Sequence, residues 1–325
     1  MAVFEISLVS LSLLLLVLLI SKIQLNKKVL LFIIPITVIV VVLHFIFNVS
    51  RWQFYPIYLS IPITIGLLYI QKVRQIKLRK LYSVTVNTLL TILFVFSVIS
   101  VLAFPMYELP TPSGDYLIGT TSFVIEDPTR EEVYSDEEYR RFKIQLWYPA
   151  ESIEGNELAP WLEGGKILSR ALAKDNFLPS FALDHTVHIM SNSYYDAPIN
   201  ETYEDYPIVV ISHGWRGFRT LHTDFAEELA SLGYIVVSID HTYGSVATVF
   251  DDEDYAYLNL DALPPRNENP DFLDDAYHLV NTYGEDIINT LDFLEELNED
   301  STSIFHEHLN LDKIGLLGHS TGGGA

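Results

Sequence analysis

The sequence predicts an α/β domain with a mainly parallel sheet, preceded by four transmembrane α-helices. Two observations carry this prediction. Residues 1–104 are strongly apolar and hold nine Lys or Arg and one acid, whereas residues 105–325 hold eleven Lys or Arg and forty-one Asp or Glu. After residue 105, short apolar runs that suit buried strands alternate with amphipathic segments that suit helices. A positively flanked apolar block followed by an acidic block is typical of a membrane anchor joined to a soluble domain.

The chain therefore divides into an anchor over residues 1–104, a linker over 105–115 and a soluble domain over 116–325. Residues 1–104 carry a net charge of +8 and residues 105–325 a net charge of −30. Such an acidic domain repels phosphate backbones, which argues against nucleic-acid binding. The chain has no cysteine, so disulfides, thiolate metal sites and cysteine nucleophiles are excluded.

Four stretches of the anchor approach the roughly 20 apolar residues needed to cross a bilayer. They are Val3–Ile20, Val29–Phe47, Trp52–Ile70 and Val84–Phe104. The chain starts with an acid, Glu5, instead of a basic region, and three further spans follow the first. The pattern therefore predicts a retained anchor and not a cleaved signal peptide.

The distribution of positive charge predicts how the anchor lies in the membrane. The second connection has only Arg51, whereas the first and third are basic, with Lys22, Lys27, Lys28, Lys72, Arg74, Lys77, Arg79 and Lys80. We therefore expect the basic connections in the cytoplasm and the soluble domain outside, in a multi-pass protein of the cell membrane. His44 and Asn87 lie within spans, where polar residues can mark an ion path. Without a carboxylate partner they are more often interhelical hydrogen bonds.

The soluble domain is predicted to open with an antiparallel hairpin and to continue with alternating strands and helices. Residues 150–205 show one plausible helix and are otherwise irregular. The expected strands are Tyr116–Ile125, Phe142–Tyr148, Pro207–Ser212, Tyr234–Ile239 and Lys313–Leu317, and the expected helices are Lys166–Lys174, Leu221–Leu232 and Asp275–Leu297. In parallel sheets of this kind, ligand sites form at the carboxyl ends of the strands.

A G-x-S-x-G motif, Gly318-His319-Ser320-Thr321-Gly322, directly follows the last predicted strand. A serine on a sharp turn from strand to helix has a strained backbone, so the residues two before and two after it must be small. The turn presents the hydroxyl at the N-terminus of the next helix, where backbone amides favour negative charge. An ordinary Gly-rich turn is the alternative, but the preceding buried strand favours a nucleophile at Ser320.

A second motif, His213-Gly214-Trp215, follows the strand Pro207–Ser212. It stands where an acyl-transfer site needs a second backbone amide. The N–H groups of Trp215 and Thr321 can form an oxyanion hole for the charge of a tetrahedral intermediate, an effect of about 3 kcal/mol for each donor. The two motifs together predict acyl transfer at Ser320 without a cofactor.

Four segments resemble, in this order, the platelet-activating-factor acetylhydrolase-like branch of the α/β-hydrolases. They are PTPSGDYLIGTTSFVIEDPTREE, RRFKIQLWYPA, ISHGWRGFRTLHTDFAEELASLGYIVVSIDH and IGLLGHSTGGGA. The resemblance implies an α/β-hydrolase fold and a calcium-independent carboxylester hydrolase that removes short or oxidised acyl groups from phospholipids. GHSTGGGA is also similar to the corresponding turn of cutinase-like polyester hydrolases. The four-span anchor lies outside the resemblance.

In this fold the triad order along the chain is Ser, then Asp or Glu, then His. Both partners of Ser320 are therefore expected beyond residue 325, and the sheet is expected to be incomplete in a fragment that ends after the nucleophile turn. A different class of function is a membrane-tethered binding or sensing protein that kept the fold and lost catalysis. A peptidase, a polyester hydrolase or a lactone hydrolase on the same scaffold is a further alternative.

Other histidines and acids are not expected to be catalytic or to bind metal. His213 and His319 adjoin positions that the backbone defines, and His241 is expected near the rim of the site. Two histidine pairs and one acidic run are predicted to be solvated loops: His185 and His188, His306 and His308, and Asp251–Asp254. The aromatic segment Pro160–Tyr195 is a candidate lid that admits acyl chains, although aromatic residues more often only pack.

Overall fold

Four apolar helices make up the first of two units, Met1–Met106 and Tyr107–Ala325, into which the computed structural model divides the chain. The structure describes residues 3–21, 23, 26–48, 51–202, 205–267 and 269–325, so Lys22 lies outside the described residues. The helices are α1 (Val3–Ile20), α2 (Lys27–Phe47), the continuous stretch Trp52–Val73 with η1 (Trp52–Phe54), α3 (Tyr55–Leu68) and η2 (Tyr69–Val73), and α4 (Lys80–Ala103). Each is long and apolar enough to cross a membrane, which agrees with the four predicted spans.

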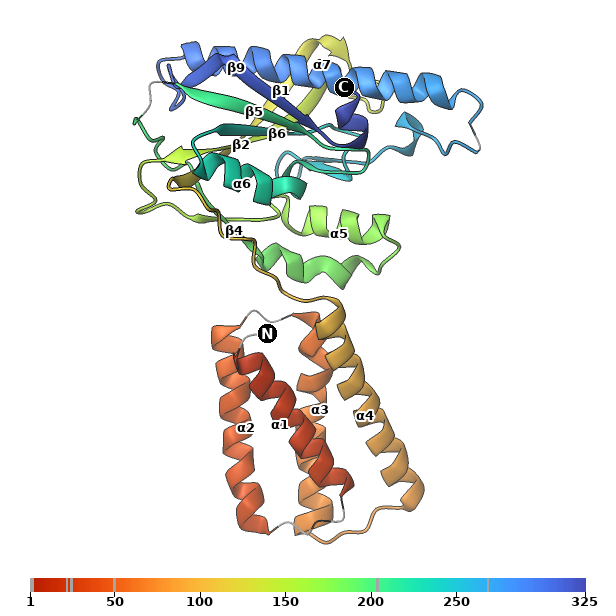
Figure 1. Ribbon diagram of the computed structural model, residues 1–325. Coiled ribbons are helices and arrows are strands. Elements are labelled where there is room, and N and C mark those ends of the chain that lie inside the picture. Colours follow the sequence, from red (N-terminus) through yellow and green to blue (C-terminus); the bar gives the residue numbers. More distant parts are fainter. Residues whose placement is uncertain (1–2, 22, 24–25, 49–50, 203–204, 268) are drawn as a thin grey trace. The chain divides into compact units, whose positions relative to one another are not determined.

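Polar contacts at the two ends of the bundle fix the order of its helices. At one end, Arg51 forms a buried ion pair of 2.6 Å with Glu5 and donates a hydrogen bond of 3.2 Å to the carbonyl of Phe104. At the other end, Lys72 Nζ donates to the carbonyl of Ser21 at 2.6 Å. The start of α1 therefore meets the α2–α3 connection and the end of α4, as an up-and-down bundle requires (Figure 1).

The two polar residues within the spans behave differently. The hydroxyl of Tyr58 on α3 lies 2.9 Å from Nδ1 of His44 on α2, which is the interhelical hydrogen bond that the sequence predicts. Asn87 Oδ1 on α4 is buried without a hydrogen-bond partner among the described residues. The interhelical bond expected of both residues is therefore found only for His44.

In its described part, the second unit is built on a sheet of seven strands in the order β3-β4-β1-β2-β6-β5-β9 (Figure 1). The strands are β1 (Leu117–Glu131), β2 (Tyr139–Ala150), β3 (Leu158–Pro160), β4 (Met190–Tyr195), β5 (Tyr206–Ser212), β6 (Ile235–Asp240) and β9 (Leu309–Gly318). β1 and β2 pair as the predicted antiparallel hairpin, and β6, β5 and β9 run parallel. The strands and their covering helices confirm the α/β fold class.

Helices cover both faces of this sheet because its central strands are apolar on both sides. On one face, α7 (Phe272–Glu299) contributes Ile287 and Leu294 to a core with Ile208 and Val210 of β5. On the other face, α6 (Thr223–Ser231) packs Ala226 and Ala230 against one residue from each of three strands: Trp147 of β2, Ile211 of β5 and Val236 of β6. Every residue of β6 is buried, as expected for a central strand of an α/β sheet.

The remaining elements are short and lie mainly in segments that the sequence left irregular. They are α5 (Gly165–Asp175), η3 (Ser180–His188), η4 (Arg219–His222), η5 (Leu260–Ala262), η6 (Ser320–Gly323) and the hairpin of β7 (Ala247–Val249) and β8 (Tyr255–Tyr257). Gly233 ends the helical turn after α6 with a φ of +95°, the left-handed conformation that glycine adopts most readily.

Residues 150–205 contain more structure than predicted. β3 and β4 add two strands to the sheet, and β4 pairs in parallel with β1 through Gly119 and Thr120. The sequence conceals β4 because its residues are largely polar. Ser193 and the backbone of Asn192 donate hydrogen bonds of 2.5 and 2.6 Å to the buried carboxylate of Glu227 on α6. β4 is therefore held against α6 by hydrogen bonds to the buried Glu227 carboxylate, and not by the apolar side chains that mark most strands.

Part of the linker, residues 110–114, packs on the second unit through hydrogen bonds. Ser113 donates its backbone N–H to Glu228 at 2.8 Å, and Gly114 N–H donates to Ser231 Oγ at 3.0 Å. Asn192 Nδ2 donates to the carbonyl of Pro110 at 3.0 Å. Residues 110–114 are thereby held on α6 and β4.

Candidate active site

The serine turn, residues Gly318–Gly322, lies where β9 ends and η6 begins. Ser320 has a φ of +53°, a left-handed conformation that is costly for a residue with a side chain. The N–H of His319 donates to the carbonyl of Ser212 at 3.1 Å, and that of Gly322 donates to the carbonyl of His319 at 3.0 Å. The backbone is therefore held in a tight turn from strand to helix, as the G-x-S-x-G motif predicts.

At both glycines of the motif, other backbone atoms occupy the space that a side chain would need. A Cβ on Gly318 would lie 2.1 Å from the carbonyl oxygen of Gly322. A Cβ on Gly322 would lie 2.3 Å from the carbonyl oxygen of Ser212 and 2.5 Å from that of His213. Both obstacles are backbone atoms, which cannot move aside as a flexible side chain can. The serine turn therefore needs glycine at both positions.

The HGW loop, residues His213–Trp215, lies against the serine turn. A Cβ on Gly214 would lie 3.0 Å from the Cβ of Ser320 and from His319 Nδ1. In the described chain, no backbone or side-chain acceptor takes a hydrogen bond from the N–H of Trp215. Thr321 lies in the first turn of η6, where backbone N–H groups have no acceptor within the helix. The two segments that meet at Ser320 thus each carry a backbone amide without an acceptor among the described residues, that of Trp215 and that of Thr321.

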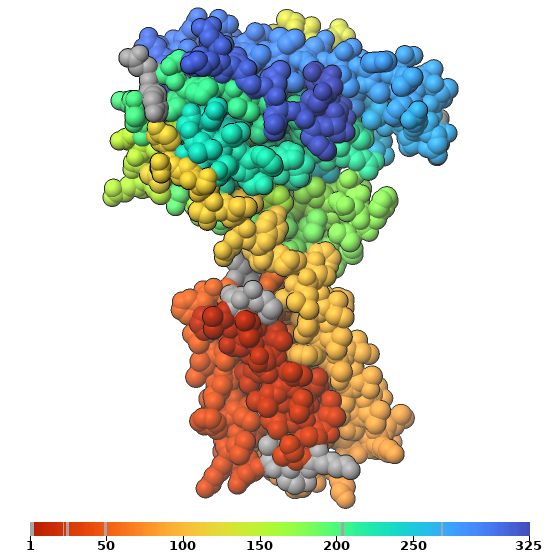
Figure 2. All heavy atoms as spheres, viewed as in Figure 1, coloured from red at the N-terminus to blue at the C-terminus, as the bar shows by residue number. Residues whose placement is uncertain are grey.

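The serine turn is accessible at the surface of its unit. Ser320 is exposed, and Leu316 and Leu317 on β9 are 62% and 46% exposed. Figure 2 shows this last segment, in dark blue, at the surface of the second unit. Among the described residues, no side chain forms a hydrogen bond with the Ser320 hydroxyl. The described chain therefore holds the serine and its flanking amides, and places no general base against the serine.

His241 is not at the rim of the site, where the sequence reasoning placed it. It is fully buried, with Nε2 2.9 Å from Ser212 Oγ and Nδ1 2.9 Å from Asp286 Oδ2. His213 is buried as well, with Nδ1 2.7 Å from the Gly214 carbonyl and Nε2 2.8 Å from Ser245 Oγ. Among the described residues, neither ring forms a hydrogen bond with the Ser320 hydroxyl.

A buried cluster of charges, which sequence reasoning missed, lies behind His241. Asp286 on α7 accepts hydrogen bonds from Arg130 Nη2 at 2.8 Å and from Arg140 at 2.8 and 3.2 Å. Burial alone would raise the pKa of Asp286, but the charge of Arg140 and hydrogen bonds from His241 and Arg140 outweigh burial and hold that pKa well below its usual range. Burial lowers the pKa of His241. Burial and the neighbouring His241 lower the pKa of His213 to about 3.

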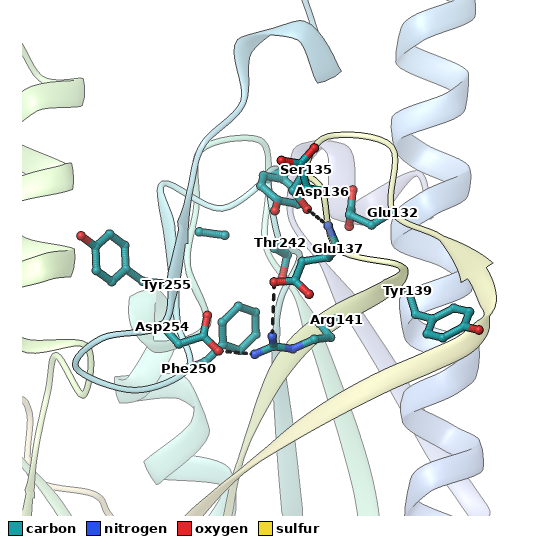
Figure 3. Close-up of a pocket in the computed structure, with 12 residues that line it drawn as sticks. Glu132, Ser135, Asp136, Glu137, Tyr139, Arg141, Thr242, Phe250, Asp254 and Tyr255 are labelled. Atoms are coloured by element: carbon teal, nitrogen blue, oxygen red, sulfur yellow. Dashed lines mark hydrogen bonds and ion pairs between the residues drawn. The ribbon is translucent and has the colours of Figure 1, made fainter.

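Among the cavities of the second unit, two are defined by the residues that line them. One of about 340 Å³ adjoins the end of β6 and is lined by acids, aromatic rings and Arg141, which stacks over Phe250 at 4.3 Å and pairs with Asp254 at 2.5 Å (Figure 3). Asp254 of the acidic run is therefore an ion-pair partner. The other cavity, of about 580 Å³, is called the α5 groove here. Its lining is Arg170, Ala171, Lys174, Asp175, Phe177, Leu178, Ser180, Arg216, Val246, Tyr257, Leu258 and Leu260.

The histidine pairs are not simply solvated loops. His185 is buried, at 3% exposure, and His306 Nδ1 lies 3.0 Å from the carbonyl of Asn298. Within the described ranges, no cluster of three or more His, Asp or Glu side chains is arranged to hold a metal ion. The local structure around both pairs is set by packing and backbone contacts.

The chain is similar in sequence to known proteins of one family. Residues 101–325 match the family described as Platelet-activating factor acetylhydrolase, isoform II. Platelet-activating factor acetylhydrolase from Canis lupus familiaris is 26% identical over 240 residues, and that from Bos taurus is 23% identical over 244 residues. Each alignment covers 66% of this chain and 50% of the relative, so the chain spans about half the length of these curated relatives.

A solved structure shares the fold. The ferulic acid esterase from Streptomyces cinnamoneus superimposes with a TM-score of 0.52 at 24% sequence identity. The match covers 67% of this chain and 56% of that chain.

Proposed function

The chain belongs to the platelet-activating factor acetylhydrolase isoform II family, and from this membership we propose that it is a serine carboxylester hydrolase with Ser320 as its nucleophile. The single observation that supports this most directly is the left-handed backbone of Ser320, packed against the HGW loop. A strained serine between two available amides suits acyl transfer, because strain of this kind persists only where the surrounding structure enforces it.

In the proposed reaction, Ser320 Oγ attacks the carbonyl carbon of an ester. The Oγ–C bond forms, the bond from that carbon to the alcohol oxygen breaks, and a general base carries the serine proton to the departing alcohol. The N–H groups of Trp215 and Thr321 stabilise the negative charge that develops on the carbonyl oxygen. Water then cleaves the acyl-enzyme to give the free acid and the original serine. This chemistry needs no cofactor.

The α5 groove supports a lipid-like ester as the substrate. Arg216, the residue directly after Trp215, is among the residues that line the groove, and much of the lining is apolar. Arg170, Lys174, Asp175 and Arg216 line it, with Arg216 paired to Asp175 at 3.1 Å and Arg170 paired to Asp184 at 2.9 Å, so Lys174 is the lining cation for which the described residues show no ion pair. A largely apolar groove with the Lys174 ammonium at its border suits an acyl or alkyl chain joined to a phosphate, as in phospholipids with short or oxidised acyl groups. α5 and η3 lie in the segment Pro160–Tyr195, the proposed lid.

We further propose that the first unit is an integral anchor with the hydrolase domain outside the cytoplasm. Arg51 is the only cation in the second connection, and its charge is neutralised by Glu5. The first and third connections carry several basic residues each, and an excess of Lys and Arg is typical of cytoplasmic loops. An anchored hydrolase of this orientation meets esters at the outer face of the membrane.

Ester hydrolysis by the purified full-length protein, which must supply the general base, tests the proposed reaction. We expect release of acid from short-acyl phospholipid esters and from simple acetyl esters, and none from a peptide amide. Ser320→Ala is expected to lower kcat by at least about 10³-fold, since it removes the nucleophile. The exposed Ser301→Ala is the matched control and keeps the activity of the original protein. Binding of esters without turnover would instead support the non-catalytic alternative.

A further inference from the structure

We propose that Ser212, His241 and Asp286 form a buried positioning relay that holds the serine turn and the HGW loop in register with each other. The inference rests on the proposed function, because it assigns these residues a role in the reactivity of Ser320. The relay connects three elements: Ser212 ends β5, His241 follows β6, and Asp286 lies on α7.

The charge of Asp286 fixes the direction of the hydrogen bonds. The carboxylate is ionised between Arg130 and Arg140, so it accepts the proton of His241 Nδ1 over 2.9 Å. The other ring nitrogen, Nε2, then carries a lone pair, and the Ser212 hydroxyl donates to it over 2.9 Å. The imidazole is also stacked on the ring of Tyr283, with centroids 3.7 Å apart and planes inclined by 12°. Charge and packing thus leave the ring one orientation.

The hydrogen-bonded series Ser–His–Asp is the same as in a catalytic triad, but here all three side chains are buried. Ser212 is 2% exposed, and His241 and Asp286 are 0% exposed. No substrate carbonyl can reach the Ser212 hydroxyl, so these three are positioning residues and do not act on the substrate directly.

Ser212 connects the relay to the serine turn through direct backbone contacts. Its carbonyl accepts the N–H of His319 at 3.1 Å. A Cβ added to Gly322 would lie 2.3 Å from the same carbonyl oxygen and 2.5 Å from the Ser212 hydroxyl oxygen. Both polar groups of Ser212 therefore lie directly beneath the backbone that carries Ser320.

A second branch reaches the HGW loop from the same histidine. The backbone N–H of His241 donates to His213 Nε2 at 3.3 Å, and Ser245 Oγ donates to the same atom at 2.8 Å. His213 Nδ1 in turn donates to the carbonyl of Gly214 at 2.7 Å, next to Trp215. The two sources of oxyanion-hole amides are therefore tied to one residue. A misplacement of about 1 Å at such a site can slow a reaction by about 10²-fold.

The rate at which a fluorophosphonate modifies Ser320 tests the relay, because this step needs the serine and the oxyanion hole in register. We expect Ser212→Ala to lower the second-order rate constant on the order of tenfold and to lower kcat similarly, with an unchanged KM for a short-acyl ester. Its melting temperature should stay close to that of the original protein, since only one hydroxyl is removed. Ser238→Ala, at an equally buried serine on β6, is the matched control and should keep the original rate.

Two substitutions of His241 keep the test decisive if Ser212→Ala does not fold. His241→Gln can place a carbonyl oxygen near the position of Nε2 and still accept from Ser212, whereas His241→Leu cannot. We expect most of the labelling rate in the Gln variant and a loss on the order of tenfold in the Leu variant.

The outcomes separate the relay from the proposed function. Labelling of the original protein with equal rates in Ser212→Ala and Ser238→Ala, whether both unchanged or both reduced, would overturn the relay alone. Equal labelling of His241→Gln and His241→Leu would do the same. If the original protein itself resisted labelling, the proposed function would fall and the relay with it.

Discussion

Gly322 shows how strictly backbone contacts constrain the candidate site. Its α-carbon faces two carbonyl oxygens, those of Ser212 and His213, at distances that exclude any Cβ. The sequence alone predicts this requirement, because the motif places a small residue two positions after the serine. Which atoms enforce it could not be predicted, since they come from a strand about 110 positions earlier in the chain.

Replacing Gly322 with alanine is therefore expected to destabilise the protein and to abolish modification of Ser320. Overpacking of this kind costs about 1–3 kcal/mol, and here the obstacles are backbone atoms. Thermal unfolding and fluorophosphonate labelling measure the two effects. Gly324→Ala is the control, because its Cβ would lie 3.4 Å from the nearest atom, an ordinary contact. Equal behaviour of both variants would show that the turn is not constrained as described.

The buried histidines predict how stability depends on pH. Burial lowers the pKa of His241, and burial and His241 lower the pKa of His213 to about 3, whereas unfolded histidine titrates near about 6.5. Below that pH the unfolded chain binds more protons than the folded one. The free energy of unfolding is therefore greatest above about pH 6.5 and falls as pH decreases, by about 1.4 kcal/mol per pH unit for each histidine.

Unfolding between about pH 7.5 and about pH 5 measures this slope. Asp286 contributes little to it, because a depressed carboxylate pKa lowers stability only below about pH 4. We expect His241→Gln to reduce the slope and a substitution of the exposed His278 by Gln to leave it unchanged. A slope that is the same in all three proteins would contradict the neutral, buried state of His241.

Among the elements, those with a regular apolar pattern could be predicted from sequence and those held by polar contacts could not. β5, β6 and β9 are within a few residues of their predictions, because continuous apolar runs mark strands of a parallel sheet, although β9 is largely exposed among the described residues and not buried as predicted. β4 was missed since its inner residues are serines, of which Ser193 donates to Glu227 and Ser191 donates to the carbonyl of Ala159. The relay of His241 was missed for a similar reason. Its acid lies on α7, 45 positions later, within a helix whose pattern shows only its amphipathic character.

The α5 groove leads to a prediction about substrate charge. Lys174→Glu is expected to raise the KM for an ester that carries a phosphate by about two- to fivefold, because an exposed charge pair is worth up to about 1 kcal/mol. The KM for an uncharged ester of the same chain length should not change. Lys313→Glu alters the net charge equally at an exposed position on β9, outside the groove, and serves as the control. A similar rise in KM for both variants would show a general charge effect and exclude phosphate recognition in the groove.

At the scale of the whole molecule, the absence of cysteine allows a direct test of membrane topology. A single cysteine at Ser301 is expected to react with a membrane-impermeant maleimide in intact cells, because the second unit is proposed to lie outside. A single cysteine at Lys77, in the third connection, should react only after the membrane is permeabilised. The reverse pattern would contradict the proposed orientation while leaving the hydrolase proposal untouched.

The central claim is that Ser320 is the nucleophile of a serine hydrolase, and mapping the site of fluorophosphonate modification tests it most directly. The purified full-length protein is treated with the reagent and digested, and the masses of its peptides are measured by mass spectrometry. The account predicts a modified peptide that contains Ser320 and no modification in Ser320→Ala. A protein that resists the reagent, or one that is still modified after Ser320→Ala, would contradict it.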